Sequence, residues 1–377
     1  MSGGVMAPGA TDALAASVAP AAPVAPDEPL APGALMRAEI AEQPARWREL
    51  IPSQRPAWQA AVDAFRAAAP ELVAFVARGS SDHAAVYGQY LVQQVLGRPA
   101  LLTTPSLHSV LGATPEYPAG VQVAISQSGR SPDLVATAVA LRGAGLPLVS
   151  ITNDVASGLA RLADVHLDLA AGPERSVAAT KSYTAELLAV HTLVRAVAGE
   201  GLAGLAHEID GLATRAERVL VRLASELPPI AEEFAAVDRV MLVGRAYSMA
   251  TAKEGALKLM ETSGIAASGW SAADAAHGPL GQVDDGTLVI ALTGTAAGRE
   301  SVVEFAAAAM ARGARILEIG PAAVADSTSI DTAAGVPDEL VPMLEVLPLQ
   351  VLAAELSSRR GMDPDRPAGL SKVTMTR

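Results

Sequence analysis

An apolar, strand-like run followed by a short polar turn and a helical segment recurs along this chain, and the whole pattern occurs twice. The stretch VAFVARGSS (73–81) is answered by VMLVGRAYS (240–248), and VAISQSGRS (123–131) is answered by VIALTGTAA (289–297). Both pairs are offset by roughly 165–170 residues, which indicates an internal repeat. Strands that alternate with helices favour a parallel sheet. We therefore predict an α/β fold with two tandem units, each a parallel sheet flanked by helices on both faces.

The same patterns divide the chain into segments. The predicted segments are a disordered Ala/Pro-rich tail (1–35), N-terminal helices (36–70), the first α/β unit (71–200), a helical connection (201–228), the second unit (229–355) and a C-terminal tail (356–377). Prolines at every third position between 20 and 32 favour an extended chain in the first of these. Within the units we expect a long helix over 174–197, and a helix over 249–262 that Gly264 ends, followed by a loop.

Composition excludes several classes of protein. The net charge is -12 and the pI is near 5.0, whereas a nucleic-acid surface needs clustered Lys and Arg. The chain has no cysteine, so disulfides, thiolate metal sites and cysteine nucleophiles are excluded. No uninterrupted apolar run reaches the roughly 18 residues that span a bilayer, and the first 35 residues lack the basic start of a secretory signal. We expect a cytoplasmic protein with no nucleic-acid or membrane partner.

The turn after the second strand-like run of the first unit is a candidate anion site. Here a strand ends, Gly129 permits a tight turn, and Pro132 suits the first turn of a helix. Exposed amides and the positive end of a helix attract phosphate. The side-chain donors of this turn are Ser126, Gln127, Ser128, Arg130 and Ser131. An ordinary polar turn with a capping serine is the alternative. The second copy of this turn (293–297) lacks the serines and the arginine, so only the first copy is expected to bind phosphate.

A second candidate site lies in the stretch 254–279. Glu254, Lys258 and Glu261 are spaced i, i+4 and i+7, so they project from one helix face, and His277 follows on the predicted loop. An acid, an amine and an imidazole can move a proton on a small polar molecule. A salt-bridged, solvent-facing helix with a stray histidine is the alternative. The histidines and carboxylates show no metal-ligand spacing, so no metal is expected.

Six motifs in order identify a resemblance to a known family. They are MRAEIAEQP (36–44), SQSGRSPD (126–133), ERSVAATKSYT (174–184), EGALKLMET (254–262), AAHGPL (275–280) and GLSKVT (369–374). With these motifs, residues 36–377 resemble the sugar isomerase (SIS) domain proteins in tandem form. They are similar to the isomerase half of glucosamine-6-phosphate synthase and to the SIS-type glucosamine-6-phosphate deaminases.

The resemblance implies a role for each matching residue. Glu261 would shuttle a proton between carbons 1 and 2 of the sugar, and Lys258 would contact the open-chain sugar oxygen. His277, supplied by the neighbouring subunit of a homodimer, would open the sugar ring. Lys372 in the terminal motif would close over the site, so 356–377 would be an active-site tail, and Glu254 would support the sugar amine. The implied phosphate ligands are Ser80, Ser126, Gln127, Ser128 and Ser131.

Further substrate contacts and some departures follow from the same motifs. Val177 in the third motif would contact the substrate, whereas Ala179 replaces a serine of the family pattern. Arg130 stands where the synthase has an acid and would also contact the substrate. The synthase releases ammonia with a glutaminase domain and a cysteine nucleophile, and neither is found in this sequence.

The resemblance therefore implies an isomerising deaminase without a cofactor. It would convert glucosamine 6-phosphate and water to fructose 6-phosphate and ammonium. A deglycase or isomerase of a related amino-sugar phosphate, an ammonia-dependent synthase and a non-catalytic phosphosugar sensor are the alternatives. The sequence leaves open the choice among glucosamine, galactosamine and fructosamine phosphates, the physiological direction, the effectors, the role of 1–35, and whether Met36 is the true start.

Overall fold

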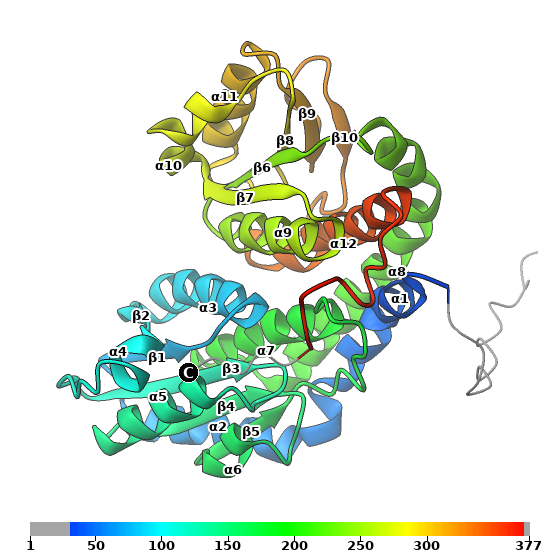
Figure 1. Cartoon of the computed structure of the whole chain (residues 1–377). Helices are drawn as coiled ribbons and strands as arrows, with labels where there is room; N and C mark the ends of the chain where they lie inside the picture. Colours follow the sequence, from blue (N-terminus) through cyan, green and yellow to red (C-terminus); the bar gives the residue numbers. More distant parts are fainter. Residues whose placement is uncertain (1–30, 373–377) are drawn as a thin grey trace, which may run out of the picture. The chain divides into compact units, whose positions relative to one another are not determined.

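The computed structural model describes residues 31–372 and contains two five-stranded sheets. Both sheets are parallel throughout. Their strand orders are β2-β1-β3-β4-β5 and, read in the corresponding direction, β7-β6-β8-β9-β10. The strands thus follow the same order in both units, and the prediction of two tandem α/β units is confirmed (Figure 1).

The first half begins with two helices and continues into the first sheet. Its elements are α1 (Ala34–Glu49), α2 (Arg55–Ala68), β1 (Leu72–Val76), α3 (Ser80–Leu91), β2 (Ala100–Leu102), α4 (Pro105–Ser109), β3 (Gly120–Ser126), α5 (Pro132–Gly143), β4 (Leu148–Thr152), α6 (Gly158–Leu162), β5 (Val165–Asp168) and α7 (Lys181–Val197). The second half repeats this plan after a long connecting helix. Its elements are α8 (Leu202–Glu233), β6 (Arg239–Gly244), α9 (Ser248–Ser263), β7 (Ala266–Ser271), α10 (Ala272–Ala276), β8 (Thr287–Leu292), α11 (Arg299–Met310), β9 (Arg315–Ile319), β10 (Thr328–Ile330) and α12 (Val341–Arg359).

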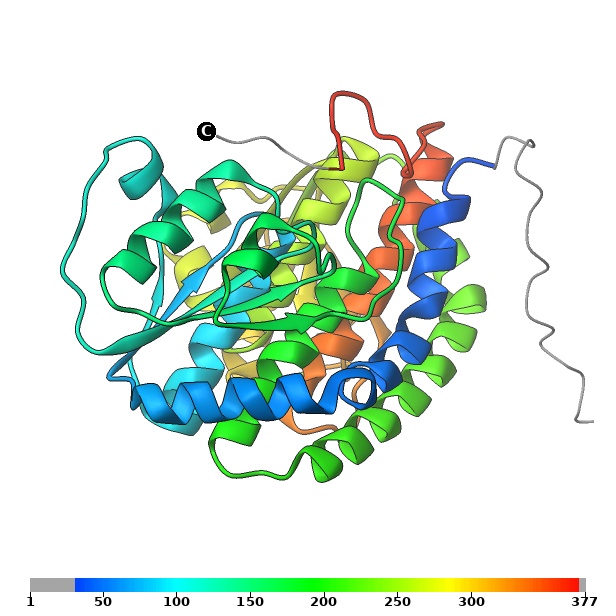
Figure 2. The ribbon, with the colours of Figure 1, turned by 90° about the horizontal axis from the view of Figure 1, so that it is seen from below.

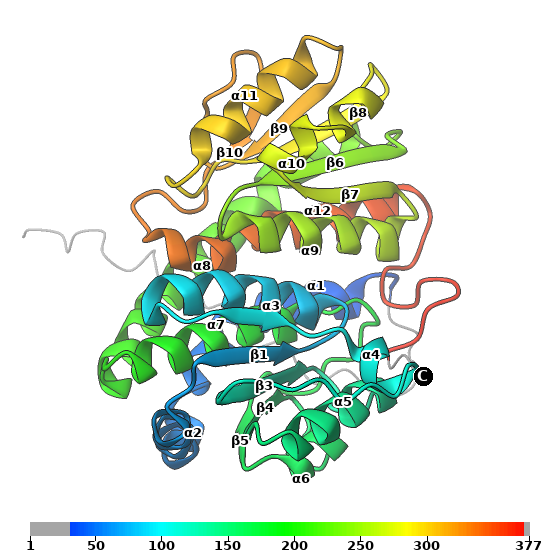
Figure 3. The ribbon, with the colours of Figure 1, turned by 90° about the vertical axis from the view of Figure 1, so that its left-hand side faces the viewer.

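Alternation along the strands places one large core between the two sheets. In β1, Val73 and Phe75 belong to the main core cluster, whereas Ala74 and Val76 belong to a separate cluster on the other face. Successive strand residues point to opposite faces, so a strand buried on both sides is apolar throughout. Helices α3, α7, α9 and α12 lie in the layer between the sheets (Figures 1 and 3). Each sheet is therefore covered on both faces.

Several short elements were absent from the sequence prediction. The edge strands β2, β7 and β10 were not predicted. Strands β2 and β10 have only three residues each, and the sequence of β7, AASGWS, is not an apolar run. The expected loop before His277 is therefore wrong, since β7 and the short helix α10 fill it. The helices α4 and α6 have only five residues each and were also missed.

Three helix boundaries differ from the prediction. Helix α1 begins at Ala34, inside the expected tail of 1–35, whose first 30 residues lie outside the described part of the chain. Helix α8 continues through Pro228 to Glu233, because its buried residues keep a helical spacing to Ala231. Helix α7 begins only at Lys181, seven residues later than expected.

The carboxylate of Glu174 explains the late start of α7. It accepts hydrogen bonds from the backbone amides of Thr180 and Ser182, at 3.0 Å each, and from the Ser182 hydroxyl at 2.7 Å. An acidic group at this place satisfies amides that a helix N-terminus leaves unpaired. Residues 174–180 therefore form a loop that approaches the site described below.

The C-terminal segment returns across the first unit. The Asp365 carboxylate accepts hydrogen bonds from the amides of Leu35 and Met36, at 3.0 and 2.8 Å, and so caps α1. Helix α1 lies beside α8 and α12 (Figure 2). Within the described residues, only Asp338–Arg359 is long and apolar enough to span a membrane, and its most apolar stretch is 89% buried inside the protein. This segment is therefore a core helix of the fold.

Candidate functional site

A polar cavity of about 340 Å³ opens at the carboxyl ends of β1 and β3. These neighbouring strands pair in parallel, and the chain leaves β1 towards β2 on one side and enters β3 on the other. Ligands of open α/β sheets bind at such a switch point. The cavity is lined by Arg78, Gly79, Ser80, Ser81, Ser126, Gln127, Ser128, Ser131, Val177, Ala179, Ser182, Glu186, Glu261, Leu370, Ser371 and Lys372.

The loop between β3 and α5 forms one wall. Gly129 has a φ of 60°, and a Cβ atom at this position would collide with the side chain of Ser157, so the turn requires glycine. The Ser126 hydroxyl accepts a hydrogen bond from the Gly129 amide at 3.1 Å. Four of the five predicted donors of this loop line the cavity. The exception is Arg130, whose guanidinium group pairs with Asp154 at 2.6 Å and is 63% exposed.

The buried face of α9 forms the opposite wall. Lys258 is fully buried, and its Nζ atom lies 2.6 Å from Glu261 Oε2 and 3.3 Å from Glu254 Oε1. Burial alone would lower the pKa of Lys258, but the carboxylates of Glu254 and Glu261 raise it above its ordinary value. Lys258 is therefore a fixed cation. The alternative of a solvent-facing charged helix is wrong, because Glu254 and Lys258 are both buried.

The Ser80 hydroxyl joins this wall to the first sheet. It donates a hydrogen bond to Glu254 Oε1 at 2.9 Å and accepts one from Lys258 Nζ at 3.3 Å. The other carboxylate oxygen of Glu254 lies 2.8 Å from His83 Nδ1. Ser80 lines the cavity, as a phosphate ligand must, but its hydroxyl faces the acid and amine of α9.

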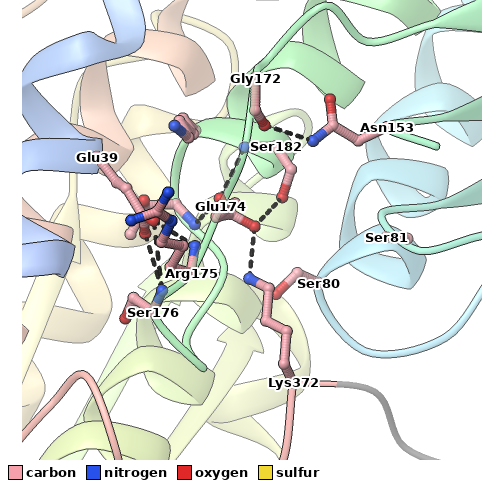
Figure 4. Close-up of polar contacts among 12 residues, drawn as sticks. Glu39, Ser80, Ser81, Asn153, Gly172, Glu174, Arg175, Ser176, Ser182 and Lys372 are labelled. Atoms are coloured by element: carbon pink, nitrogen blue, oxygen red, sulfur yellow. Dashed lines mark hydrogen bonds and ion pairs between the residues drawn. The ribbon is translucent and has the colours of Figure 1, made fainter. Parts of the chain in front are cut away.

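The C-terminal segment covers the cavity. Lys372 Nζ donates a hydrogen bond to Glu174 Oε2 at 2.7 Å, and Glu174 in turn holds Ser182 (Figure 4). Burial alone would raise the pKa of Glu174, but the Lys372 ammonium group and the backbone amides keep it below its ordinary value. The terminal motif thus reaches the site, although its residues 373 and 374 lie outside the described chain. Val177 also lines the cavity, as expected.

His277 is not part of this cavity. It follows α10 in the second unit, is exposed to solvent and is absent from the cavity lining. The structure of one chain therefore brings together Glu254, Lys258, Glu261 and Lys372 but leaves the imidazole elsewhere. Its predicted role requires a second subunit and remains a prediction.

Sequence reasoning missed several residues of the site, among them Arg78 and Glu186. Arg78 lines the cavity and pairs with Asp133 at 3.0 Å. Ser81 follows the predicted ligand Ser80 directly, and its hydroxyl lies 2.8 Å from Glu186 Oε1. Glu186 is one helical turn after Ser182 on α7, and an acid among apolar helix positions was the available signal.

The equivalent loop of the second unit holds an internal carboxylate. The Asp338 side chain accepts hydrogen bonds from the amides of Ala296 and Ala297, at 2.7 and 2.8 Å. The Gly294 amide donates to Glu345 Oε1 at 3.3 Å. These loop amides are thus already paired within the chain. Among residues 31–372, no group of three or more His, Asp or Glu side chains is placed to hold a metal ion.

Two parallel α/β units in tandem, with a polar cavity at the switch point of the first, define the structural class of this protein. A match to a family model gives the narrower assignment: the SIS domain model matches residues 70–196 and 233–357. The chain belongs to the SIS domain family, and the resemblance noted from its motifs is confirmed.

Individual relatives agree with this assignment. The glutamine–fructose-6-phosphate aminotransferase (isomerizing) of Gloeobacter violaceus is 34% identical over 320 residues, which cover 80% of this chain and 51% of that protein. The chain spans about half the length of the curated relatives it matches. A candidate phosphosugar isomerase from Silicibacter pomeroyi has a crystal structure with a TM-score of 0.78 and 31% identity, covering 88% of this chain and 99% of that one.

A more distant structure shows the same fold. The glucosamine-6-phosphate deaminase of Thermotoga maritima has a TM-score of 0.76 at 20% identity, covering 91% of this chain and 100% of that one. Identity at this level establishes the shared fold alone.

Proposed function

We propose that this protein is an isomerising glucosamine-6-phosphate deaminase. One observation carries the proposal: the loop of Ser126–Ser131 lines the same cavity as Glu261 of α9, which pairs with the buried Lys258, and Lys372 is also part of the lining. A sugar phosphate needs both features, an anion site remote from the reacting carbons and a proton carrier beside them. The similarity to a glutamine–fructose-6-phosphate aminotransferase and to a candidate phosphosugar isomerase supports the same substrate class.

The phosphate group would bind at the loop before α5. Its amides, the hydroxyls of Ser126, Ser128 and Ser131, and the amide of Gln127 supply the donors, and α5 contributes the positive end of its dipole. Arg78 adds a cation at the cavity wall. Binding energy from this end would hold the open-chain sugar across the cavity towards α9.

The proton transfer is assigned to Glu261. As a carboxylate it takes the proton from carbon 2 of the open-chain amino sugar, which gives an enolamine, and it returns a proton to carbon 1. The product is the imine at carbon 2, and addition of water with loss of ammonia gives fructose 6-phosphate. Lys258, held at 2.6 Å, orients Glu261 and contacts the sugar oxygen. A positioned acid–base group of this kind contributes about 10²–10⁴-fold to the rate.

Ring opening is assigned to His277 of a neighbouring subunit in a homodimer. His277 is exposed and is absent from the cavity lining of its own chain, and both observations support a role across an interface. The reaction as written needs no cofactor, because the carbonyl group at carbon 1 of the open-chain sugar accepts the electron pair that the proton leaves on carbon 2. We also propose a cytoplasmic location, where such phosphosugars are metabolised.

Deamination is favoured over glutamine-dependent synthesis on chemical grounds. These 377 residues contain no cysteine, so no thiol of this sequence can attack glutamine. Ammonia-dependent synthesis, turnover of a related amino-sugar phosphate and ligand sensing without turnover remain as competing proposals. Glu261 and Lys258 argue against a pure sensor, which needs only the phosphate loop.

The test is ammonium release from glucosamine 6-phosphate, galactosamine 6-phosphate and fructosamine 6-phosphate under identical conditions. We expect glucosamine 6-phosphate to give the highest kcat/KM and fructose 6-phosphate as the product. Faster release from either of the others would assign a different substrate. Binding of all three without ammonium release would instead favour the sensor.

A further inference from the structure

Glu186 is a buried carboxyl group at the cavity that the proposed mechanism leaves unused. It lies on α7 and is only 1% exposed, yet it is part of the cavity lining. Its Oε1 atom lies 2.8 Å from the Ser81 hydroxyl. Its Oε2 atom is buried and has no hydrogen-bond partner among residues 31–372. An ionised carboxylate that is buried with one oxygen lacking a hydrogen-bond partner costs free energy, so this environment favours the neutral acid.

The charges around Glu186 also disfavour its ionised form. Carboxylates face it from two directions, Glu174 from the loop before α7 and Glu254 from α9, and Lys372 of the C-terminal segment is the opposing cation. Tyr183 lies on the same helix. The other charged groups of the cavity wall are Arg78 and Glu261. Burial and these carboxylates raise the pKa of Glu186 to about 8, so its carboxyl group is mainly neutral at pH 7.

The protonation of Glu186 decides which way the Ser81 hydroxyl points. Against an ionised Glu186, Ser81 must donate its only proton to Oε1 and presents lone pairs to the cavity. Against a neutral Glu186, the carboxyl O–H donates to Ser81 Oγ, and the Ser81 proton is free to turn to a ligand. The distance of 2.8 Å suits both arrangements.

Ser81 is well placed to donate to a phosphate oxygen. It lies in the first turn of α3, the helix that follows β1, and lines the same cavity as the loop of Ser126–Ser131. The neighbouring Ser80 hydroxyl is already bound to Glu254 and Lys258. Ser81 is therefore the hydroxyl of this turn that can serve an anion.

We propose that Glu186 acts as a neutral acid that holds Ser81 as a hydrogen-bond donor to the phosphate of the substrate. It is a positioning residue, and the inference rests on the proposed phosphosugar site. Loss of its proton turns the Ser81 donor away and places a negative charge beside the phosphate. Phosphosugar affinity therefore falls as the pH rises through the pKa of Glu186, without any change in the groups that move protons on the sugar.

The experiment measures the dissociation constant of fructose 6-phosphate by calorimetry between pH 7.5 and 9.5, with inorganic phosphate as a second probe. Over this range the phosphate monoester of fructose 6-phosphate is already a dianion, since the second pKa of such a group is about 6. If only the neutral form binds, the wild-type affinity falls about tenfold per pH unit above pH 8, or about 25-fold across the range. Glu186→Gln keeps an N–H donor towards Ser81 but cannot titrate, so its affinity stays nearly constant.

Two further variants serve as controls. Glu345→Gln removes a buried acid with a raised pKa at the corresponding place in the second unit, away from the cavity, and keeps the wild-type pH profile. Ser81→Ala loses affinity at pH 7.5, and this loss shrinks by pH 9.5, where the wild-type Ser81 no longer donates. Thermal unfolding checks that each variant is folded.

The outcomes separate two failures. A flat wild-type profile, or a profile that falls equally in Glu186→Gln, would overturn the role of Glu186 while leaving the phosphosugar site intact. If neither fructose 6-phosphate nor inorganic phosphate bound at any pH, the phosphosugar site itself would be refuted, and this inference with it.

Discussion

The two strand-to-helix loops at the equivalent positions of the two sheets differ in where their amides find partners. After β3, the loop of Ser126–Ser131 opens on a cavity and carries hydroxyl groups. After β8, the amides of Ala296 and Ala297 are bound by Asp338 of the same chain. A duplicated fold thus supplies two anion-binding geometries, and one of them is satisfied internally. In the first loop, within residues 31–372, the amides of Gly129 and Arg130 bond only to hydroxyls of the same loop, those of Ser126 and Ser128, and no carboxylate occupies the turn. The comparison shows that backbone shape alone does not make a ligand site, because a carboxylate of the same chain can take the place of the anion.

The same contrast extends to the buried acids. Glu186 and Glu345 lie near the N-termini of the corresponding helices α7 and α12, and each has an oxygen without a partner in the described residues. Glu186 borders the cavity, whereas Glu345 accepts the Gly294 amide of the closed loop. Each of the following variants tests whether function resides only in the first loop and the α9 face that it opposes.

The largest effect is expected for Glu261→Gln. Removing the carboxylate that carries the proton should lower kcat by about 10³-fold, within the range for general acid–base groups, with little change in phosphosugar affinity. Steady-state ammonium release measures it. Glu304→Gln, an exposed acid on α11, is the matched control and should retain activity. Full turnover in Glu261→Gln would remove Glu261 from its assigned role.

The next effect is expected for Ser131→Ala, which gives the first loop the residue found at the corresponding position, Ala297, of the second. Loss of a hydrogen bond to a charged phosphate should raise the dissociation constant of fructose 6-phosphate about 10- to 100-fold. Titration calorimetry measures the change. An unchanged constant would show that the phosphate lies elsewhere.

A smaller effect concerns pH and stability in the second unit. Burial raises the pKa of Glu345 to about 7. Because its folded pKa lies above its unfolded value of 4.5, Glu345 favours the folded state most at low pH, and this contribution is lost as the pH rises towards 7. Glu345→Gln should therefore gain stability relative to wild type by about 2 kcal/mol between pH 5 and pH 8. Denaturant unfolding at the two pH values measures this, and an equal difference at both would contradict it.

The smallest effect is expected for Asp338→Ala, which opens the second loop. Loss of a carboxylate bound to two amides should cost about 1 kcal/mol of stability. Added inorganic phosphate should bind the opened loop of the variant and raise its melting temperature more than it raises that of the wild type, whose loop is occupied by Asp338. A variant that melts as the wild type does would show that the carboxylate does not hold the loop.

The residues that sequence could predict are those whose role depends on local pattern. The repeat, the parallel sheets and the loop around Gly129 follow from apolar runs and turn chemistry over a few residues. Helical spacing predicts that Glu254, Lys258 and Glu261 share one face of a helix, but it does not predict that this face is buried.

What could not be predicted depends on partners distant in sequence. Lys372 meets Glu174 across 198 positions, and Ser81 meets Glu186 across 105. Asp338 reaches the Ala296 amide across 42. No local sequence pattern predicts such contacts, because each depends on how the two units and the C-terminal segment pack. The late start of α7 likewise depends on a contact outside the local pattern, because the Glu174 carboxylate binds the backbone amides of Thr180 and Ser182.

The stoichiometry of phosphosugar binding tests the central claim most directly. Calorimetric titration of the wild-type chain with fructose 6-phosphate should give one site per chain, and Ser131→Ala should weaken that same site while Asp338→Ala leaves its affinity unchanged. Two sites per chain in the wild type, or one site that responds to Asp338→Ala and not to Ser131→Ala, would contradict the assignment of function to the first loop.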